Sequence, residues 1–164
     1  MNLRAVFKSM DFRQLWSLFW LSARHPRFIL PTIRGTRRTI TICDELYGDK
    51  QHLNGLENAF RHALWNVLLV HFSTKKGLPL ERSLAWAKKI TDWHEDFSPN
   101  AALARAMDLH NNRVGRDIIA QFHPEEEHFF VAHLLKMVPL SRKLTDAYNT
   151  SLEKDVLVHI DEII

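Results

Sequence analysis

The chain has 164 residues, of which 46% are hydrophobic and 25% are charged. This composition is typical of a soluble globular domain and excludes a disordered, collagen-like or disulfide-stapled chain. Only five glycines and six prolines are present, and this shortage of turn-forming residues disfavours many-stranded β architectures. Cys43 is the only cysteine, which excludes an internal disulfide and a cysteine-rich zinc module. We therefore expect a single all-α domain over residues 1–164, a compact bundle of six or seven helices.

Six segments show the apolar spacing or the capping residues of helices. They cover residues 11–22, 31–47, 54–76, 79–95, 98–122 and 125–138. Pro31, Pro79 and Pro99 suit the first positions of three of these helices, and Gly48 follows the end of the second. We expect the helices over 54–76 and 98–122 to be central, because apolar residues surround most of their circumference. The chain from residue 141 onward is expected to be mixed helix and coil.

The N-terminal forty residues carry most of the positive charge. They hold eight Lys or Arg residues and one acid, a net charge of +7, whereas the other 124 residues hold 14 basic and 18 acidic residues, a net charge of −4. Leu15, Trp16, Phe19 and Trp20 crowd the helix beside this basic cluster. Either these side chains pack on the core and the arginines are solvated, or residues 1–40 contact an anionic membrane surface. Nucleic acid is not expected as a partner, because the rest of the chain is acidic and has no recognised binding motif.

Neither a membrane-spanning segment nor a signal peptide is expected. The longest stretches without Lys, Arg, Asp or Glu cover residues 14–23 and 64–74, well short of the roughly 18 to 20 apolar residues that span a bilayer. Asp11 and Arg13 also interrupt the first apolar run, unlike the residues of a signal peptide. We therefore expect a cytoplasmic protein, peripheral to the membrane if the basic segment binds lipid.

Three short polar segments lie on three successive predicted helices. They are residues 58–66 (NAFRHALWN), 92–95 (DWHE) and 107–116 (MDLHNNRVGR). In the first segment Asn58, His62 and Asn66 recur every four residues and so lie along one helix face. Most of that helix is apolar, and each buried amide or imidazole costs roughly 1 to 3 kcal/mol unless it is hydrogen-bonded. These side chains therefore require polar partners on neighbouring helices.

The third segment supplies a matching set of polar groups. Asp108 and Asn112 are one helical turn apart, and Gly115 lies about one turn further along the same face. A glycine at that position lets another backbone or a substrate approach closely. His110 points about 200° away from Asp108 on an ideal helix, so both face one site only if the helix is distorted or the site wraps around it.

In these three segments the sequence resembles a bacterial family of small all-helical domains of unknown function, the DUF6973 type. The resemblance rests on the residues at 58–66, on His94-Glu95 and on the residues at 107–116, and it extends over roughly residues 30–120. No established reaction accompanies these motifs. The resemblance implies that His62, Glu95, Asp108 and the Asn111-Asn112 pair belong together.

The residue types in these segments favour a site that binds a divalent metal or performs acid–base catalysis. Imidazole and carboxylate groups form the mixed nitrogen and oxygen ligand sets of Zn or Mg/Mn sites. We expect His62, Glu95 and Asp108 to converge on one cavity as the catalytic residues. The expected metal ligands are His62, His94, Glu95, Asp108 and His110. The expected substrate-binding residues are Asn58, Arg61, Asn66, Asn111, Asn112 and Arg116.

This set of residues predicts a hydrolase, with or without a metal, that cleaves a phosphoester or another ester in a lipid or a nucleotide. An arginine would clamp an anionic substrate, and the carboxylates are expected to raise the pKa of the neighbouring imidazole. Two alternatives use the same residues. In the first they form a buried network that fixes helix register within a non-enzymatic module that binds a membrane or a partner. In the second they line a non-catalytic ligand pocket.

Overall fold

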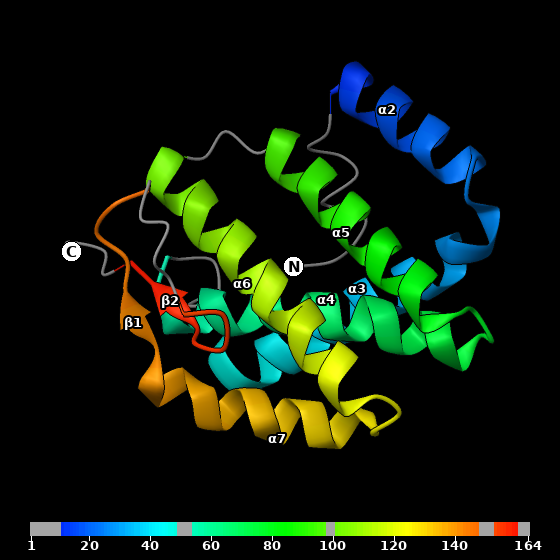
Figure 1. Cartoon of the computed structure of the whole chain (residues 1–164). Coiled ribbons are helices and arrows are strands. Elements are labelled where there is room, and N and C mark those ends of the chain that lie inside the picture. The colour runs from blue at the N-terminus through cyan, green and yellow to red at the C-terminus, as the bar shows by residue number, and fades with distance from the viewer. Residues whose placement is uncertain (1–10, 49–53, 98–100, 148–152, 161–164) are drawn as a thin grey trace.

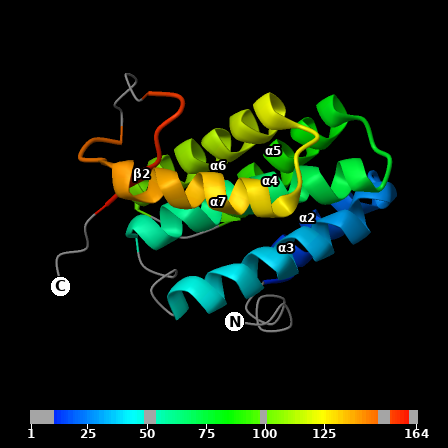
Figure 2. The same ribbon diagram turned by 90° about the horizontal axis from the view of Figure 1, so that it is seen from below.

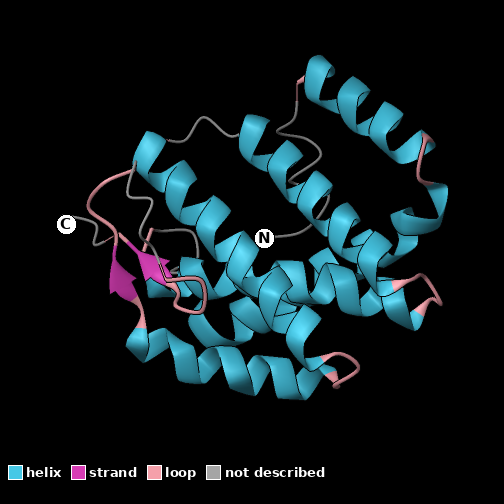
Figure 3. Cartoon of the chain, in the orientation of Figure 1, coloured by secondary structure: helices cyan, strands magenta, loops and turns pink. Residues whose placement is uncertain are grey.

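The computed structural model describes residues 11–48, 54–97, 101–147 and 153–160. Six α-helices pack together in this part of the chain (Figures 1 and 3). They are α2 (Phe12–Ala23), α3 (Pro26–Tyr47), α4 (Leu56–Lys75), α5 (Leu80–Phe97), α6 (Ala102–Phe122) and α7 (Glu127–Met137). The 3₁₀ turn η2 (Val138–Leu140) follows α7, and the strands β1 (Arg142–Lys143) and β2 (Val158–His159) form one parallel pair. The all-α prediction is confirmed.

Helix α4 lies at the centre of the bundle. It packs against α3, α5, α6 and α7, which lie around it in two perpendicular views (Figures 1 and 2). Phe60, Leu64 and Leu68 of α4 are fully buried, and apolar side chains of the surrounding helices complete the same cluster. The central position expected of this helix is confirmed, because a helix with apolar residues around most of its circumference has little surface left for solvent.

Two boundaries differ from the sequence prediction. Helix α3 begins at Pro26 rather than at Pro31, with His25 as its N-cap residue, and Pro31 lies buried inside the helix. Proline fits the first turn without loss, and burial of Pro31 offsets the one helical hydrogen bond that it cannot make. The tail from residue 141 was expected to be mixed helix or coil. Its described residues are coil and turns apart from the two short strands β1 and β2, and none of them is helical. Ser98 and Pro99, which were expected to start α6, lie outside the described residues.

Helix α2 contributes no fully buried residue to the core. Leu15, Trp16 and Phe19 are exposed, so of the two alternatives for these side chains, the one in which they pack on the core is wrong. Leu18 and Leu21 contact the core cluster instead and are partly buried. The helix therefore directs its smaller apolar side inward and its aromatic side outward. None of the helices in the described part of the chain has the length and hydropathy needed to cross a membrane.

Helices α4 and α6 meet backbone to backbone at Gly115. A Cβ atom built at Gly115 would overlap the carbonyl oxygen of Ala63 and lie 2.8 Å from the Ala63 Cα atom, whereas real Cβ atoms essentially never approach other heavy atoms within 3.0 Å. Gly35 of α3 is also tight against α4, with a built Cβ atom 3.1 Å from the backbone of Leu68. Two glycines therefore set how closely α3 and α6 approach the central helix.

We expect Gly115→Ala to destabilise the fold. In an unobstructed helix this change stabilises by roughly 0.5 to 1 kcal/mol, but at Gly115 the added methyl group has to displace the α4 backbone, at a cost of about 1 to 3 kcal/mol or more. Urea denaturation followed by circular dichroism measures the difference. Gln121→Ala, at an exposed position of the same helix, is the control and should stay within about 0.5 kcal/mol of the parent. An unchanged or increased stability of Gly115→Ala would contradict the close packing.

Candidate functional site

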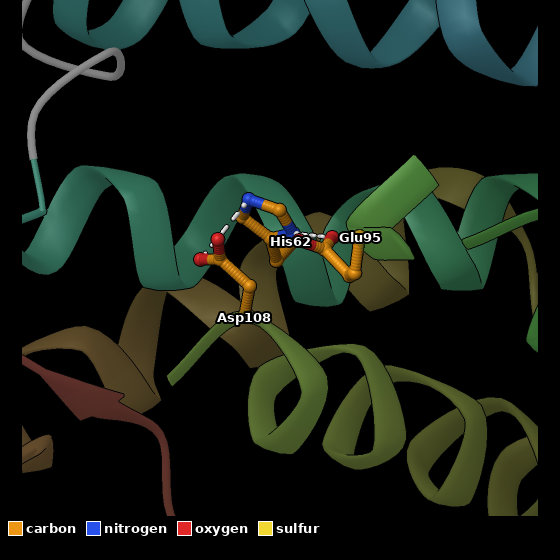
Figure 4. A group of neighbouring side chains, drawn as sticks. All are labelled: His62, Glu95 and Asp108. Atoms are coloured by element: carbon orange, nitrogen blue, oxygen red, sulfur yellow. Dashed lines mark ion pairs between the residues drawn. The ribbon is translucent and has the colours of Figure 1, made fainter. Parts of the chain in front are cut away.

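Three buried side chains from three helices meet beside the α4–α6 contact. His62 comes from α4, Glu95 from α5 and Asp108 from α6, and their exposed fractions are 3%, 1% and 3%. Nδ1 of His62 lies 3.6 Å from Oε1 of Glu95, and Nε2 lies 3.3 Å from Oδ1 of Asp108. Figure 4 shows the imidazole between the two carboxyl groups. The convergence expected from the sequence is present, and we call these residues the His62 triad.

Helix geometry explains why the triad forms at this place. Ala63, the residue that touches Gly115, directly follows His62 in α4. Asn112 and Asp108 precede Gly115 by about one and two turns of α6, so they lie on the side of α6 that faces α4. The contact at Gly115 therefore brings the polar stripe of α4 opposite the polar stripe of α6.

Two asparagines connect the triad to all three helices. Oδ1 of Asn112 accepts hydrogen bonds from Nδ2 of Asn66 (2.7 Å) and from Nδ1 of His62 (3.2 Å). Nδ2 of Asn112 donates to Oε1 of Glu95 (3.3 Å). Oδ1 of Asn66 in turn accepts a hydrogen bond from Nη1 of Arg116 (2.8 Å). Each side-chain oxygen and nitrogen of Asn112 and Asn66 has a partner in this way, so both side chains help to orient the imidazole.

Arg61 contacts the other edge of the imidazole. Its Nη2 donates to Oδ1 of Asn58 (2.9 Å) and to Nε2 of His62 (3.1 Å). Because a guanidinium group only donates hydrogen bonds, Nε2 accepts and the proton of the neutral imidazole lies on Nδ1. The lone pair of Nε2 therefore points toward Arg61 and Asp108. This edge holds the Arg61 cation, the carboxyl group of Asp108 and the nitrogen lone pair that accepts the hydrogen bond from Arg61.

Burial shifts the pKa values of two residues of the triad, His62 and Glu95. It lowers the pKa of His62 well below its ordinary value, and the charges of Arg61 and His94 lower it further. The expectation that a neighbouring carboxylate raises this pKa is wrong, because desolvation of imidazolium outweighs that attraction. Burial and then Asp108 raise the pKa of Glu95 to about 8. Without a bound cation, Glu95 is therefore mostly protonated and His62 is neutral at pH 7.

The triad has the composition of a metal-binding group. One donor atom from each of His62, Glu95 and Asp108 lies within 4.8 Å of the other two. Oε2 of Glu95 is buried and has no hydrogen-bond partner among the described residues. A buried carboxylate oxygen without a partner is costly, so an added proton, water or cation at this atom would stabilise the site.

Two other predicted site residues, His94 of α5 and Arg116 of α6, lie near the triad without joining it. The ring of His94 packs edge-on against Trp65, with centroids 5.3 Å apart, and burial and then Arg61 lower its pKa to about 4. Arg116 bonds to Asn66 and contacts Thr91, one turn of α6 away from Asn112. Among the described arginines, Arg61 is thus the one placed to meet an anion at the triad.

His110 and Asn111 do not contact the triad, contrary to the sequence prediction. Nε2 of His110 is hydrogen-bonded to the carbonyl of Val156 (2.8 Å). Asn111 donates to the carbonyl of Val158 (2.8 Å) and accepts from its backbone N–H (3.0 Å). His110 lies on a different face of α6 from Asp108, whereas Asn111 is three residues from Asp108 and its amide is engaged by the Val158 backbone instead of the triad. They bind the C-terminal tail.

Sequence analysis did not identify Thr91 as part of this site. It is fully buried on α5, and its Oγ1 bonds to the carbonyl of Ala87 (2.9 Å) and lies 3.4 Å from Oδ1 of Asn66. Thr91 is four residues before Glu95, so both lie on one helix face. This spacing was the available signal, and it extends the polar stripe of α5 by one turn.

Comparison with known families identifies the chain. A family model described as a domain of unknown function (DUF6973) matches residues 19–148. The chain belongs to this family. The match includes all three segments that hold the His62 triad and exceeds the range over which the motifs were recognised. No curated protein and no solved structure matches the chain, so the chemistry of this DUF6973 protein has to be argued from its geometry.

In chelator-treated protein, the free energy of unfolding is expected to decrease as the pH rises, in part because of Glu95. We expect Glu95→Gln to remove this part of the decrease. The folded-state pKa of Glu95 is raised to about 8 from an ordinary 4.5, so between these values the unfolded chain loses this proton and the folded chain keeps it. Stability is then lost as the pH rises through this window. Glutamine stays neutral, so the variant should gain stability relative to the parent between pH 5 and pH 8.

Urea denaturation at about pH 5 and pH 8 measures this difference. His62 titrates in both proteins and cancels in the comparison. Asp96→Asn changes the neighbouring, exposed carboxylate and is the matched control, for which no such gain is expected. An equal pH dependence of the parent and Glu95→Gln would show that Glu95 is ionised in the folded protein.

Proposed function

We propose that the chain is a metal-dependent hydrolase whose divalent cation is held by His62, Glu95 and Asp108. The observation that carries the proposal is the convergence of one imidazole and two carboxyl groups, whose donor atoms lie within 4.8 Å of one another. Glu95 and Asp108 approach opposite ring nitrogens of His62, so bonds of about 2.0 to 2.2 Å to a common cation require the carboxyl groups to turn toward one nitrogen. If that nitrogen is Nε2, Arg61 has to release it. Oε2 of Glu95, which has no hydrogen-bond partner among the described residues, is an available ligand atom.

The ligand types favour particular cations. One imidazole nitrogen with two carboxylates suits Zn²⁺ or Mn²⁺ better than Mg²⁺, which prefers oxygen ligands and retains water. Three protein ligands leave a coordination position for water or substrate, as in catalytic rather than structural zinc sites. A cation bound in this way supplies an activated water and polarises an ester oxygen.

The chain's own residues supply the remaining functions. Arg61 is partly buried, is hydrogen-bonded to His62 and lies beside Asp108, which places a cation where an anionic substrate oxygen would sit. Asn112 fixes the tautomer of His62 through Nδ1. A cation at this edge favours a phosphoester or another ester, carried by a lipid or a nucleotide, as the substrate class.

One observation favours a different, non-enzymatic function. Each residue of the His62 triad is at most 3% exposed, and Asn66 and Asn112 join the triad to α4, α5 and α6 through direct hydrogen bonds. A sealed network of this kind fixes helix register without any reaction. In that case the triad is the structural core of a module that binds a partner or a membrane through another surface.

Metal binding is the first test of the hydrolase. We expect chelator-treated protein to bind about one equivalent of Zn²⁺ or Mn²⁺ in calorimetric titration and to gain thermal stability on binding. Glu95→Gln and Asp108→Asn should bind at least about tenfold more weakly, a loss that even groups adjacent to ligands can cause. Asp96→Asn and Asp117→Asn change exposed carboxylates on the same two helices and are the matched controls.

Hydrolysis is the second test. We expect the metal-loaded chain to cleave at least one of p-nitrophenyl phosphate, bis-p-nitrophenyl phosphate and p-nitrophenyl butyrate. Asp108→Asn should lower kcat/KM by about 100-fold or more, whereas Asp117→Asn should leave it unchanged. Absence of both metal binding and hydrolysis, together with unfolding of His62→Ala and Asp108→Asn in thermal melts, would instead support the structural network.

A further inference from the structure

The outer face of α2 is a large apolar surface. Phe12, Trp16 and Phe19 are more than half exposed, at 77%, 53% and 58%, and Leu15 and Trp20 are 39% and 45% exposed. The rings contact one another in series, with centroids about 6 Å apart from Phe12 to Trp16 and from Trp16 to Phe19. Aromatic side chains in such numbers are normally buried. We call these five residues the α2 ridge.

The ridge is held in place by the other side of α2. Trp93 of α5 donates from Nε1 to Oγ of Ser17 (3.0 Å), and Gln14 donates from Nε2 to the carbonyl of Phe97 (3.2 Å). Leu18 and Leu21 pack on the core cluster from the same side. At about 100° per residue, these anchoring residues lie opposite the ridge. The helix is therefore docked through one face while the other faces outward.

Basic residues border the ridge. Arg13 and Arg24 are exposed and lie along one edge of it, and Arg24 contacts the ring of Trp20 at 5.8 Å. A cavity of about 430 Å³ between α2 and α5 adjoins this edge, and Arg24 and Lys89 line it. Burial lowers the pKa of His25 in this cavity, and the charges of Lys89 and Arg24 lower it further. Asp92 and Asp96 also line this cavity, so the positive charge beside the ridge comes from Arg13 and Arg24 along its edge.

We propose that the α2 ridge binds an anionic membrane surface, with α2 lying in the plane of the headgroups. An apolar helix face with aromatic rings and flanking arginines is the pattern of helices that bury one side at the boundary between headgroups and acyl chains. The neighbouring arginines and Lys89 match anionic headgroups in charge. This proposal does not depend on the hydrolase activity.

Other occupants of the ridge fit less well. A second copy docked with its α2 antiparallel, through a two-fold axis perpendicular to the helix, would bring the edge with Arg13 and Arg24 close to its own equivalent, and like charges would oppose each other. Single-stranded nucleic acid stacks on aromatic rings, but the acidic remainder of the chain repels a polyanion. An anionic bilayer matches both features, because the apolar face of α2 can enter the boundary of the acyl chains while Arg13 and Arg24 contact the headgroups.

Vesicle sedimentation with the full chain tests the proposal. We expect binding to vesicles of phosphatidylcholine with about 30% phosphatidylserine at low salt, little binding to pure phosphatidylcholine, and a marked decrease at about 0.5 M NaCl. Trp16→Ser with Phe19→Ser should reduce the partition coefficient by at least about tenfold. Leu46→Ser with Leu140→Ser removes two other exposed apolar side chains and should leave it unchanged.

A second pair of variants tests the contribution of the basic residues to vesicle binding. Arg13→Glu with Arg24→Glu should abolish the preference for anionic vesicles, whereas Arg113→Glu with Arg142→Glu, at exposed sites elsewhere, should retain most of it. Circular dichroism checks that each variant folds. Absence of vesicle binding at low salt, or binding that the ridge variant leaves undiminished, would overturn the proposal. A protein that does not bind vesicles but forms a dimer or binds nucleic acid, and loses that interaction in the ridge variant, would also overturn the proposal.

Discussion

The structure depends on one steric constraint, the contact of Gly115 in α6 with the backbone of Ala63 in α4. No side chain fits between these two backbones, so the helices cross at a distance that only glycine allows. At that distance, short polar side chains reach across the interface directly: Asn112 contacts both Asn66 and His62. With a larger residue at the crossing, the helices would separate and the same amides would lose their partners. The glycine at position 115 therefore allows both the close packing of α4 and α6 and the hydrogen bonds between their polar side chains.

Burial then sets the electrostatics of the site. The low polarity of the interior favours the neutral form of both groups. For His62 the neutral form is the deprotonated one, and for Glu95 it is the protonated one. The positively charged guanidinium group of Arg61 lies at the edge where Asp108 approaches Nε2 of His62. A divalent cation bound by Glu95 would displace the proton of its carboxyl group.

Local spacing predicted the helical fold and the polar faces of α4 and α6, whereas the grouping of His62, Glu95 and Asp108 came from the resemblance to the DUF6973 family and from the need of buried polar groups for partners. Residues three or four apart share a helix face wherever the helix packs, so His62 with Asn66 and Asp108 with Asn112 could be grouped before any fold was known. The same reasoning failed for Asn111 and His110. Their partners lie in the tail, more than forty residues away, and no helical period relates them. The exposed aromatic face of α2 was also left undecided, because spacing shows that a helix has two faces and not which one points inward.

Adjacent asparagines in α6 illustrate how differently two identical side chains are used. Asn112 recognises other side chains, so its role is lost if any of its partners changes identity. Asn111 recognises only the backbone N–H and carbonyl of Val158, as a neighbouring strand would. Every residue except proline presents that same pair of groups. The tail can therefore vary at position 158, within the limits of the space available, and still attach at the same place, whereas position 111 has almost no alternative.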